Sequence, residues 1–164
     1  METTKFVKVS DLKGNYAPNV LEKPGVYCWW FPERDVVKLF ESAKLSLNIQ
    51  RIQFRKLSGE YYVALYCGES RNLRNRFKNH INGSQDKSTL RRTIGKLFKI
   101  TETEITNLLL ECYLEWFYVS SVCMSKYIEA CELAFPRYYY PFNKTDHIFN
   151  PRSKTHCEKV FETL

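Results

Sequence analysis

The sequence predicts an α+β fold in which a small β-sheet is combined with several amphipathic helices. Aromatic and β-branched residues are concentrated in short runs at 26–31, 61–66 and 112–118, a composition typical of buried strands. Between residues 73 and 110, apolar residues recur every three or four positions, which is the spacing of helices that cover a core. With 164 residues, of which 44% are hydrophobic, the chain is long enough for one packed domain without disulfide or metal support.

The first strands are predicted between residues 24 and 68. Residues 1–23 show little periodicity and are expected to form an N-terminal lead-in segment. Pro24 and Gly25 interrupt the chain before the strand at 26–31, whereas residues 32–47 are ambiguous. An imperfect alternation at 49–57, followed by turn residues at 58–60, predicts a hairpin whose second strand ends at residues 66–68.

Three helices are predicted between residues 73 and 110. In the first, Leu73, Phe77 and Ile81 recur every four residues. Ser88 is a candidate N-cap for the second, and an acidic start at Glu102 indicates the third. Alternation at 112–118 then predicts a strand, residues 125–135 a further helix, and residues 147–164 a C-terminal tail.

The positive charge of the chain is concentrated in one segment. The formal net charge is +7, and residues 71–99 contain nine basic residues but one acidic residue. A segment of this kind favours binding to a polyanion, because phosphates dominate the affinity of proteins for nucleic acids. The alternative is an ordinary solvated helix face, which usually carries both signs of charge. The candidate nucleic-acid-binding residues are Arg71, Arg74, Lys78, Arg91, Arg92 and Lys96.

The composition argues against several other classes of protein. Six cysteines are scattered without a Cys-x-x-Cys pair, so we expect reduced, mostly buried thiols. His147, His156 and Cys157 do not match the spacing of a common zinc site. The N-terminus does not resemble a signal peptide and the longest apolar run is too short to span a bilayer. We therefore expect a cytoplasmic protein without a membrane partner.

Two short triplets carry the most specific information in the chain. Gly25-Val26-Tyr27 is followed, after a long interval, by Tyr66-Cys67-Gly68, and Arg76 stands ten residues beyond the second tyrosine. Together with Glu132 and Asn143, this ordered set resembles the GIY-YIG nuclease family. The resemblance implies a small central antiparallel sheet flanked by helices, in a domain that we place at residues 24–146. The 38 residues between Tyr27 and Tyr66 suggest an insertion near 32–57 that widens the sheet or adds a hairpin.

The resemblance also implies a reaction, the hydrolysis of DNA phosphodiester bonds with Mg²⁺ (or Mn²⁺). In that reaction Tyr27 and Tyr66 lie near the attacking water, with Tyr27 favoured as the base, and Arg76 binds the phosphate. Glu132 is the expected metal ligand, with Glu129 as the alternative, and Asn143 completes the set. A tyrosine with a pKa near 10 needs a nearby cation to act as a base at neutral pH, and arginine offers a planar fork of donors to phosphate. His80 either contacts the phosphate or closes its helix.

The sequence leaves three alternatives open. An inert nucleic-acid-binding module on the same fold is favoured by Glu69, which occupies a position where many family members carry a lysine. RNA is a second candidate partner, because exposed aromatic side chains stack on unpaired bases. The oligomeric state is also open, and a dimer is among the arrangements considered.

Overall fold

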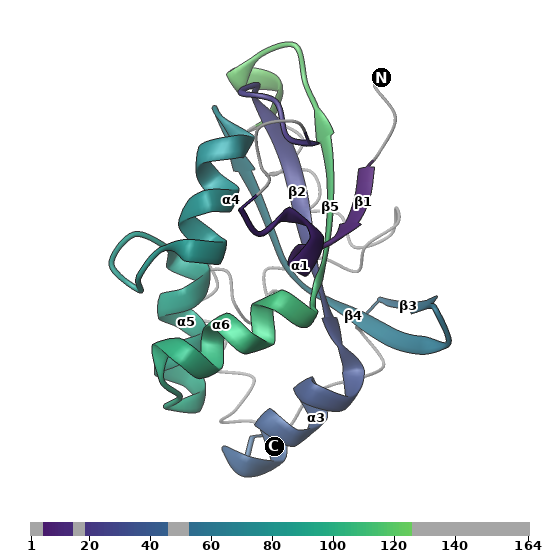
Figure 1. The fold of residues 1–164 in the computed structure, drawn as a ribbon, viewed down its shortest axis with the longest axis vertical. Coiled ribbons are helices and arrows are strands. Elements are labelled where there is room, and N and C mark those ends of the chain that lie inside the picture. Colours follow the sequence, from purple (N-terminus) through teal and green to yellow (C-terminus); the bar gives the residue numbers. More distant parts are fainter. Residues whose placement is uncertain (1–4, 15–18, 46–52, 126–164) are drawn as a thin grey trace.

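A computed structural model describes residues 5–14, 19–45 and 53–125 and shows a central antiparallel β-sheet with helices packed on it (Figure 1). The strand order in the five-stranded sheet is β1-β5-β2-β4-β3, and every neighbouring pair is antiparallel. The strands are β1 Lys5–Lys8, β2 Gly25–Pro32, β3 Phe54–Leu57, β4 Glu60–Ser70 and β5 Tyr113–Tyr118. The predicted α+β fold with a central antiparallel sheet flanked by helices is confirmed.

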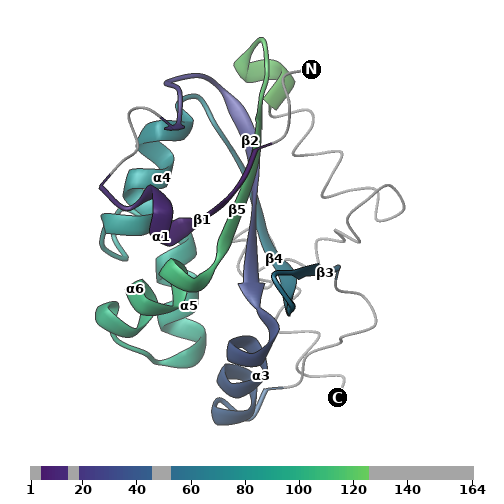
Figure 2. The same cartoon turned by 45° about the vertical axis from the view of Figure 1, so that its right-hand side comes forward.

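The helices begin where the sequence supplies capping side chains. Asn72, Ser88 and Thr101 each accept a hydrogen bond from the backbone N–H three residues further on, at the starts of α4, α5 and α6. Figure 2 shows α1, α4, α5 and α6 on one face of the sheet. None of the helices in the described residues is long and apolar enough to cross a membrane. The helices are α1 Val9–Leu12, α3 Glu33–Ser42, α4 Leu73–Asn82, α5 Thr89–Phe98 and α6 Glu102–Glu111.

The main core lies between the sheet and these helices. All eight residues of β2 are buried, so this central strand is covered on both faces. On the helix side, Trp29 and Trp116 pack with Phe77 of α4, and the ring of Phe77 meets Trp116 edge-on at 5.4 Å between centroids. The predicted apolar stripe of the first helix is confirmed, since Leu73, Phe77 and Ile81 are all buried.

A β-bulge in β4 determines which side chains face the helices. Trp29 of β2 lies opposite Tyr66, but the next residue, Trp30, lies opposite Ala64, so Leu65 is an extra residue in the ladder. Strict alternation would place Tyr66 on the face of Ala64, away from the helices. The extra residue moves Tyr66 onto the helix-covered face, where Tyr27 also lies.

The structure differs from the sequence-based prediction at three places. β4 does not end at residues 66–68 but continues to Ser70, because it pairs with β2 as far as Gly25. The expected lead-in segment contains β1, which pairs with β5 at the edge of the sheet. Residues 32–57 contain α3 and the edge strand β3, which forms the expected hairpin with β4. Of the helix predicted at 125–135, only the first residue lies within the described part, where residues 122–125 are helical.

Candidate active site

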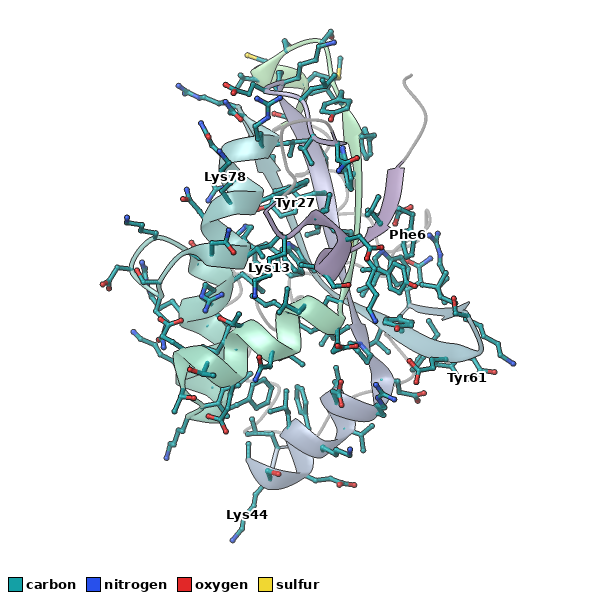
Figure 3. The ribbon with its side chains drawn as sticks, in the orientation of Figure 1. Phe6, Lys13, Tyr27, Lys44, Tyr61 and Lys78 are labelled. Carbon is teal, nitrogen blue, oxygen red and sulfur yellow. The ribbon has the colours of Figure 1, made fainter. Side chains whose placement is uncertain are left out.

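Two tyrosines from adjacent strands converge beneath α4. Tyr27 comes from β2 and Tyr66 from β4, and their ring centroids are 6.1 Å apart. The ring of Phe77 packs edge-on against Tyr27 at 5.4 Å. Both tyrosines are almost fully buried, and Figure 3 shows Tyr27 between the sheet and α4, with Lys78 on the outer side of that helix. The strand pairing therefore brings together two residues that are far apart in the sequence.

The two motif glycines give the tyrosines the space that they occupy. Gly68 lies opposite Tyr27 in the ladder, and a Cβ atom added there would be 2.6 Å from the Tyr27 Oη atom and 2.8 Å from its Cζ atom. At Gly25 a Cβ atom would collide with the carbonyl oxygen of Phe117 and with the side chain of Leu73. The second glycine thus accommodates the Tyr27 ring, and the first allows β5 and α4 to approach β2 closely.

His80 links the tyrosine pair to the start of α5. Its imidazole is fully buried, with Nε2 2.9 Å from the Tyr27 Oη atom and Nδ1 2.7 Å from the Ser88 Oγ atom. Burial lowers the pKa of His80 well below 6.5, and the charges of Arg76 and Arg91 lower it further. His80 is therefore neutral near pH 7. The two roles expected from the sequence, phosphate contact or helix closure, do not describe this ring, which contacts Tyr27 from inside the protein.

Arg76 supplies positive charge to the same cluster. Burial raises the pKa of Tyr27 well above 10, Tyr66 raises it further by charge and hydrogen bonding, and Arg76 opposes both by lowering it. Within the described residues the Arg76 guanidinium makes no ion pair or side-chain hydrogen bond. A half-buried, unpaired guanidinium beside a pair of phenols is suited to an anionic ligand.

A family comparison agrees with this geometry, since the model of the GIY-YIG catalytic domain matches residues 25–143. The chain belongs to the GIY-YIG family. The match begins at the first motif glycine and covers both tyrosines, Arg76 and His80. This is a family of nuclease type that acts on nucleic acids, and its members generally use divalent metal ions. No curated protein and no solved structure shows a significant match to the chain.

The predicted basic surface of this GIY-YIG domain is only partly available to a ligand. Arg71, Lys78 and Lys96 are exposed on or beside α4 and α5. Arg92 is also exposed, although its guanidinium donates to the carbonyl oxygens of the loop before α5. Arg74 instead donates to the Val20 carbonyl oxygen at 2.7 Å and pairs with Glu22 at 2.8 Å, so it fastens the segment before β2 to α4.

The prediction that Arg91 contacts a phosphate is wrong, because this side chain is only 2% exposed. Its guanidinium pairs with Glu102 at 2.8 Å and donates to the carbonyl oxygens of His80 and Ile81 and to the Thr106 hydroxyl. These partners come from α4 and α6, the helices before and after α5 in the chain. Arg91 therefore holds three helices together and does not add to the exposed charge.

Glu69 does not lie beside the tyrosines. It follows Gly68 in β4, so its side chain leaves the sheet on the face opposite Tyr27 and Tyr66. There it accepts a hydrogen bond from the Ser125 hydroxyl at 3.1 Å. Among the described residues, the feature that favoured an inert module therefore lies on the other face of the sheet from the two tyrosines.

The acidic part of the predicted site falls outside the described residues, because Glu129, Glu132 and Asn143 all lie between 126 and 164. In the part of the chain that the structure describes, no three His, Cys, Asp or Glu side chains gather in a way that would hold a metal ion. The described residues alone do not fit a divalent ion.

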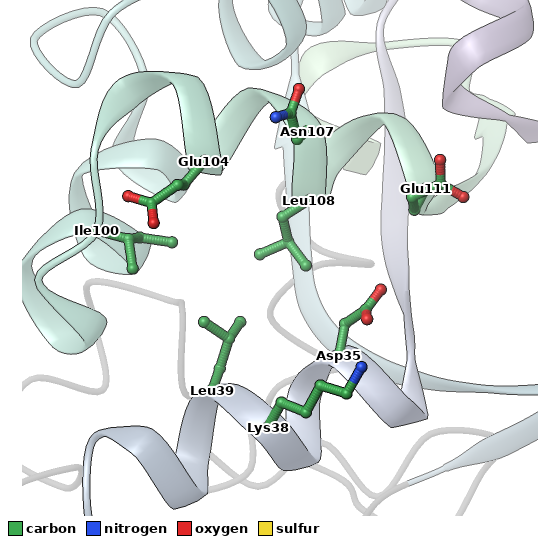
Figure 4. A pocket seen from close by; sticks show the side chains of 8 residues that line it. All are labelled: Asp35, Lys38, Leu39, Ile100, Glu104, Asn107, Leu108 and Glu111. Atoms are coloured by element: carbon green, nitrogen blue, oxygen red, sulfur yellow. The ribbon is translucent and has the colours of Figure 1, made fainter.

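A cavity of about 340 Å³ lies elsewhere, between α3 and α6 (Figure 4). Leu39, Ile100 and Leu108 form its apolar surface. Three carboxylates and one lysine surround them, which gives the cavity a negative net charge; these residues are Asp35, Glu104, Glu111 and Lys38. A site of this charge repels phosphate. None of the described residues that are predicted to act on nucleic acid lines it.

Sequence reasoning missed the contribution of Ser88 to this GIY-YIG site. Its position predicts an N-cap, and the structure confirms that role, but the same hydroxyl also reaches His80. The interval of eight residues between His80 and Ser88 contains no pattern that indicates this contact. It arises because the loop after α4 turns the chain back, so that α5 begins beside the last turn of α4.

Proposed function

We propose that this GIY-YIG domain is an endonuclease that hydrolyses DNA phosphodiester bonds with a divalent metal ion, Mg²⁺ or Mn²⁺. The observation that carries the proposal is the convergence of Tyr27 and Tyr66 with His80 and with the Arg76 guanidinium, which has no ion-pair partner among the described residues.

Each side chain has a role that follows from its chemistry. Arg76 offers planar donors to the scissile phosphate and offsets the charge that develops on its oxygens. Tyr27 handles the proton of the attacking water, and Tyr66 orients the Tyr27 hydroxyl. Because burial keeps Tyr27 protonated in the free protein, its phenolate needs positive charge and hydrogen-bond donors near Oη. Arg76 and His80 are the two groups of the described chain placed to supply them.

The metal ion belongs to the proposal through Glu132, with Glu129 as the alternative ligand. One carboxylate with several waters is an ordinary arrangement for Mg²⁺, and the bound ion supplies Lewis-acid stabilisation of charge on the phosphate. The exposed cations Arg71, Lys78, Arg92 and Lys96 are proposed to bind the DNA backbone. A cytoplasmic location stays a prediction from the sequence, which does not decide between a monomer and a dimer.

The test is cleavage of supercoiled plasmid in Mg²⁺ and in EDTA by the full chain and three variants. Tyr27→Phe removes the reacting hydroxyl, whereas Tyr62→Phe is a matched control, because Tyr62 is buried on the other face of the sheet. We expect Mg²⁺-dependent nicking or linearisation that Tyr27→Phe and Glu132→Ala lose and Tyr62→Phe retains. Cleavage by Tyr27→Phe at the wild-type rate would refute the proposal.

The alternatives are distinguished when the Glu129→Ala variant and further substrates, including single-stranded RNA, are added to this experiment. If DNA substrates of varied sequence are retarded in a gel by the protein but are not cut, the protein is an inert binding module. Cleavage of single-stranded RNA in preference to DNA would change the substrate class. If Glu132→Ala cleaves normally and Glu129→Ala does not, the metal ligand is Glu129.

A further inference from the structure

A chain of hydrogen bonds runs from the start of α5 to the tyrosine pair. The Ser88 hydroxyl lies 2.7 Å from His80 Nδ1, and His80 Nε2 lies 2.9 Å from the Tyr27 Oη atom. Ser88 and His80 are both fully buried, so water cannot replace either contact. Two tautomers of a neutral imidazole fit these distances, and they assign opposite roles to His80.

Counting donors and acceptors distinguishes the two tautomers. Ser88 Oγ already accepts the backbone N–H of Arg91 at 3.2 Å, as the N-cap of α5. Its hydroxyl proton needs an acceptor of its own, and among the described contacts of Ser88 the only such atom is His80 Nδ1. If Nδ1 carried the proton instead, the buried Ser88 hydroxyl would have two donors pointing at it and no acceptor, which is costly.

We propose that Ser88 is a positioning residue that holds His80 in the Nε2–H tautomer, so that His80 donates a hydrogen bond to the Tyr27 Oη atom. In this arrangement His80 does not remove a proton from Tyr27. It remains neutral, keeps its own proton and stabilises negative charge on the phenol oxygen. Tyr27 directs its hydroxyl proton toward Tyr66, in agreement with the hydrogen bonding by which Tyr66 raises the pKa of Tyr27.

The charges around the imidazole support this neutral state. Arg76 lies on the same helix as His80 and Arg91 on the helix packed beside it, and both oppose a second proton on the ring. The titratable groups that face the ring from β2 and β4 are the phenols of Tyr27 and Tyr66, and burial raises the pKa of Tyr27, so this phenol is uncharged in the free protein. A doubly protonated imidazole could not accept from Ser88.

The catalytic meaning of this tautomer rests on the proposed function, but the tautomer itself is measurable without any substrate. The ¹⁵N spectrum of the imidazole groups in the uniformly labelled full chain distinguishes a protonated ring nitrogen from a bare one. The His80→Gln variant identifies the signals of His80 among those of the three histidines. We expect a protonated Nε2 and a bare Nδ1 for His80 at pH 7.5. A protonated Nδ1 with a bare Nε2 would overturn the proposal.

Variants at Ser88 separate positioning from helix capping. Ser88→Ala removes both the cap and the donor to His80, whereas Ser88→Thr keeps both groups. Thr101→Ala is the matched control, because it removes the N-cap of α6, where the side chain is exposed and bonded to Glu104. We expect Ser88→Ala alone to give a mixture of His80 tautomers. A pure Nε2–H tautomer in Ser88→Ala would show that Ser88 does not select it.

The kinetic expectation follows from the loss of one hydrogen bond. We expect Ser88→Ala to lower kcat for DNA cleavage about tenfold with unchanged KM, Ser88→Thr to restore it, and Thr101→Ala to leave it unaffected. Wild-type kcat in Ser88→Ala would overturn the positioning role. A wild-type protein that does not cleave DNA would refute the proposed function but leave the tautomer measurement standing. If Ser88→Ala does not fold, the wild-type spectrum still decides the tautomer.

Discussion

Replacing Gly68 with alanine tests whether the second motif glycine is required by the Tyr27 ring. The backbone at this position does not have a positive φ, so an alanine is compatible with it. Without a collision, Gly68→Ala would stabilise the fold by about 0.4–1 kcal/mol through the entropy of the unfolded chain. The collision reverses this expectation, because the new Cβ atom would lie 2.8 Å from Tyr27 Cζ and 2.6 Å from Oη.

The size of the destabilisation by Gly68→Ala follows from the packing around Tyr27. Carbon atoms in contact prefer about 3.5 Å, so the ring must move by roughly 0.7 Å. It has little room for this, since Phe77, Tyr66 and His80 surround it with centroids at 5.4, 6.1 and 5.6 Å. Overpacking of this kind costs about 1–3 kcal/mol, and it also disturbs the hydrogen bond to His80. We expect the free energy of unfolding to fall by about 1–2 kcal/mol and cleavage to be lost.

The assay is urea unfolding of the full chain, analysed as a double-mutant cycle with Tyr27→Phe. Removing the hydroxyl relieves the shorter of the two contacts, so we expect Gly68→Ala to cost less in the Tyr27→Phe background. The rescue should be partial, because the ring carbon remains. A Gly68→Ala variant that is as stable as the wild type, with additive effects in the cycle, would refute the reasoning.

Three further predictions follow from the structure. Arg91→Leu should lower the free energy of unfolding by about 3 kcal/mol, because it leaves buried carbonyl oxygens of α4 without their donor. Arg92→Ala should change it by less than about 0.5 kcal/mol. Equal effects of the two substitutions in urea unfolding would contradict the structural role assigned to Arg91. The pKa of His80 is lowered in the folded protein, so as the pH falls the unfolded chain binds a proton at this imidazole before the folded protein does. The free energy of unfolding therefore keeps its full value above about pH 6.5 and falls by about 1.4 kcal/mol per pH unit below it. Unfolding measured from pH 7 to pH 5 should show this slope in the wild type and not in His80→Gln, and the same slope in both would exclude His80 as its source. Lys78→Ala should reduce by about 0.9 the magnitude of the slope of log affinity for DNA against log salt concentration. Lys44 is exposed just beyond α3, and Lys44→Ala should leave this slope unchanged. Identical slopes for the two variants would show that the DNA does not bind at Lys78.

The elements that depend on local periodicity were predictable from the sequence. The stripe of Leu73, Phe77 and Ile81 predicts α4, and Ser88 predicts the start of α5, because both depend only on residues close in the chain. The order of the two triplets, with Arg76 beyond them, predicted the family and the fold.

Other features depend on contacts that local patterns do not contain. Period-two alternation places Tyr66 on the wrong face of the sheet, and only the extra residue Leu65 corrects it. The burial of Arg91 depends on Glu102 and on carbonyl oxygens of a different helix, so its charge alone suggested a surface residue.

The connection between the two triplets leaves the sheet at the end remote from the tyrosines. Tyr27 pairs with Gly68 near one end of the β2–β4 ladder, whereas Pro32 pairs with Tyr62 at the other, about 17 Å further along the strand. Insertions in the connection between α3 and β3 therefore leave unchanged the β2–β4 pairing that sets the distance between the tyrosines. For protein engineering, this end of the sheet is where a fluorescent label or a second binding domain can be attached while the chemistry beneath α4 is preserved.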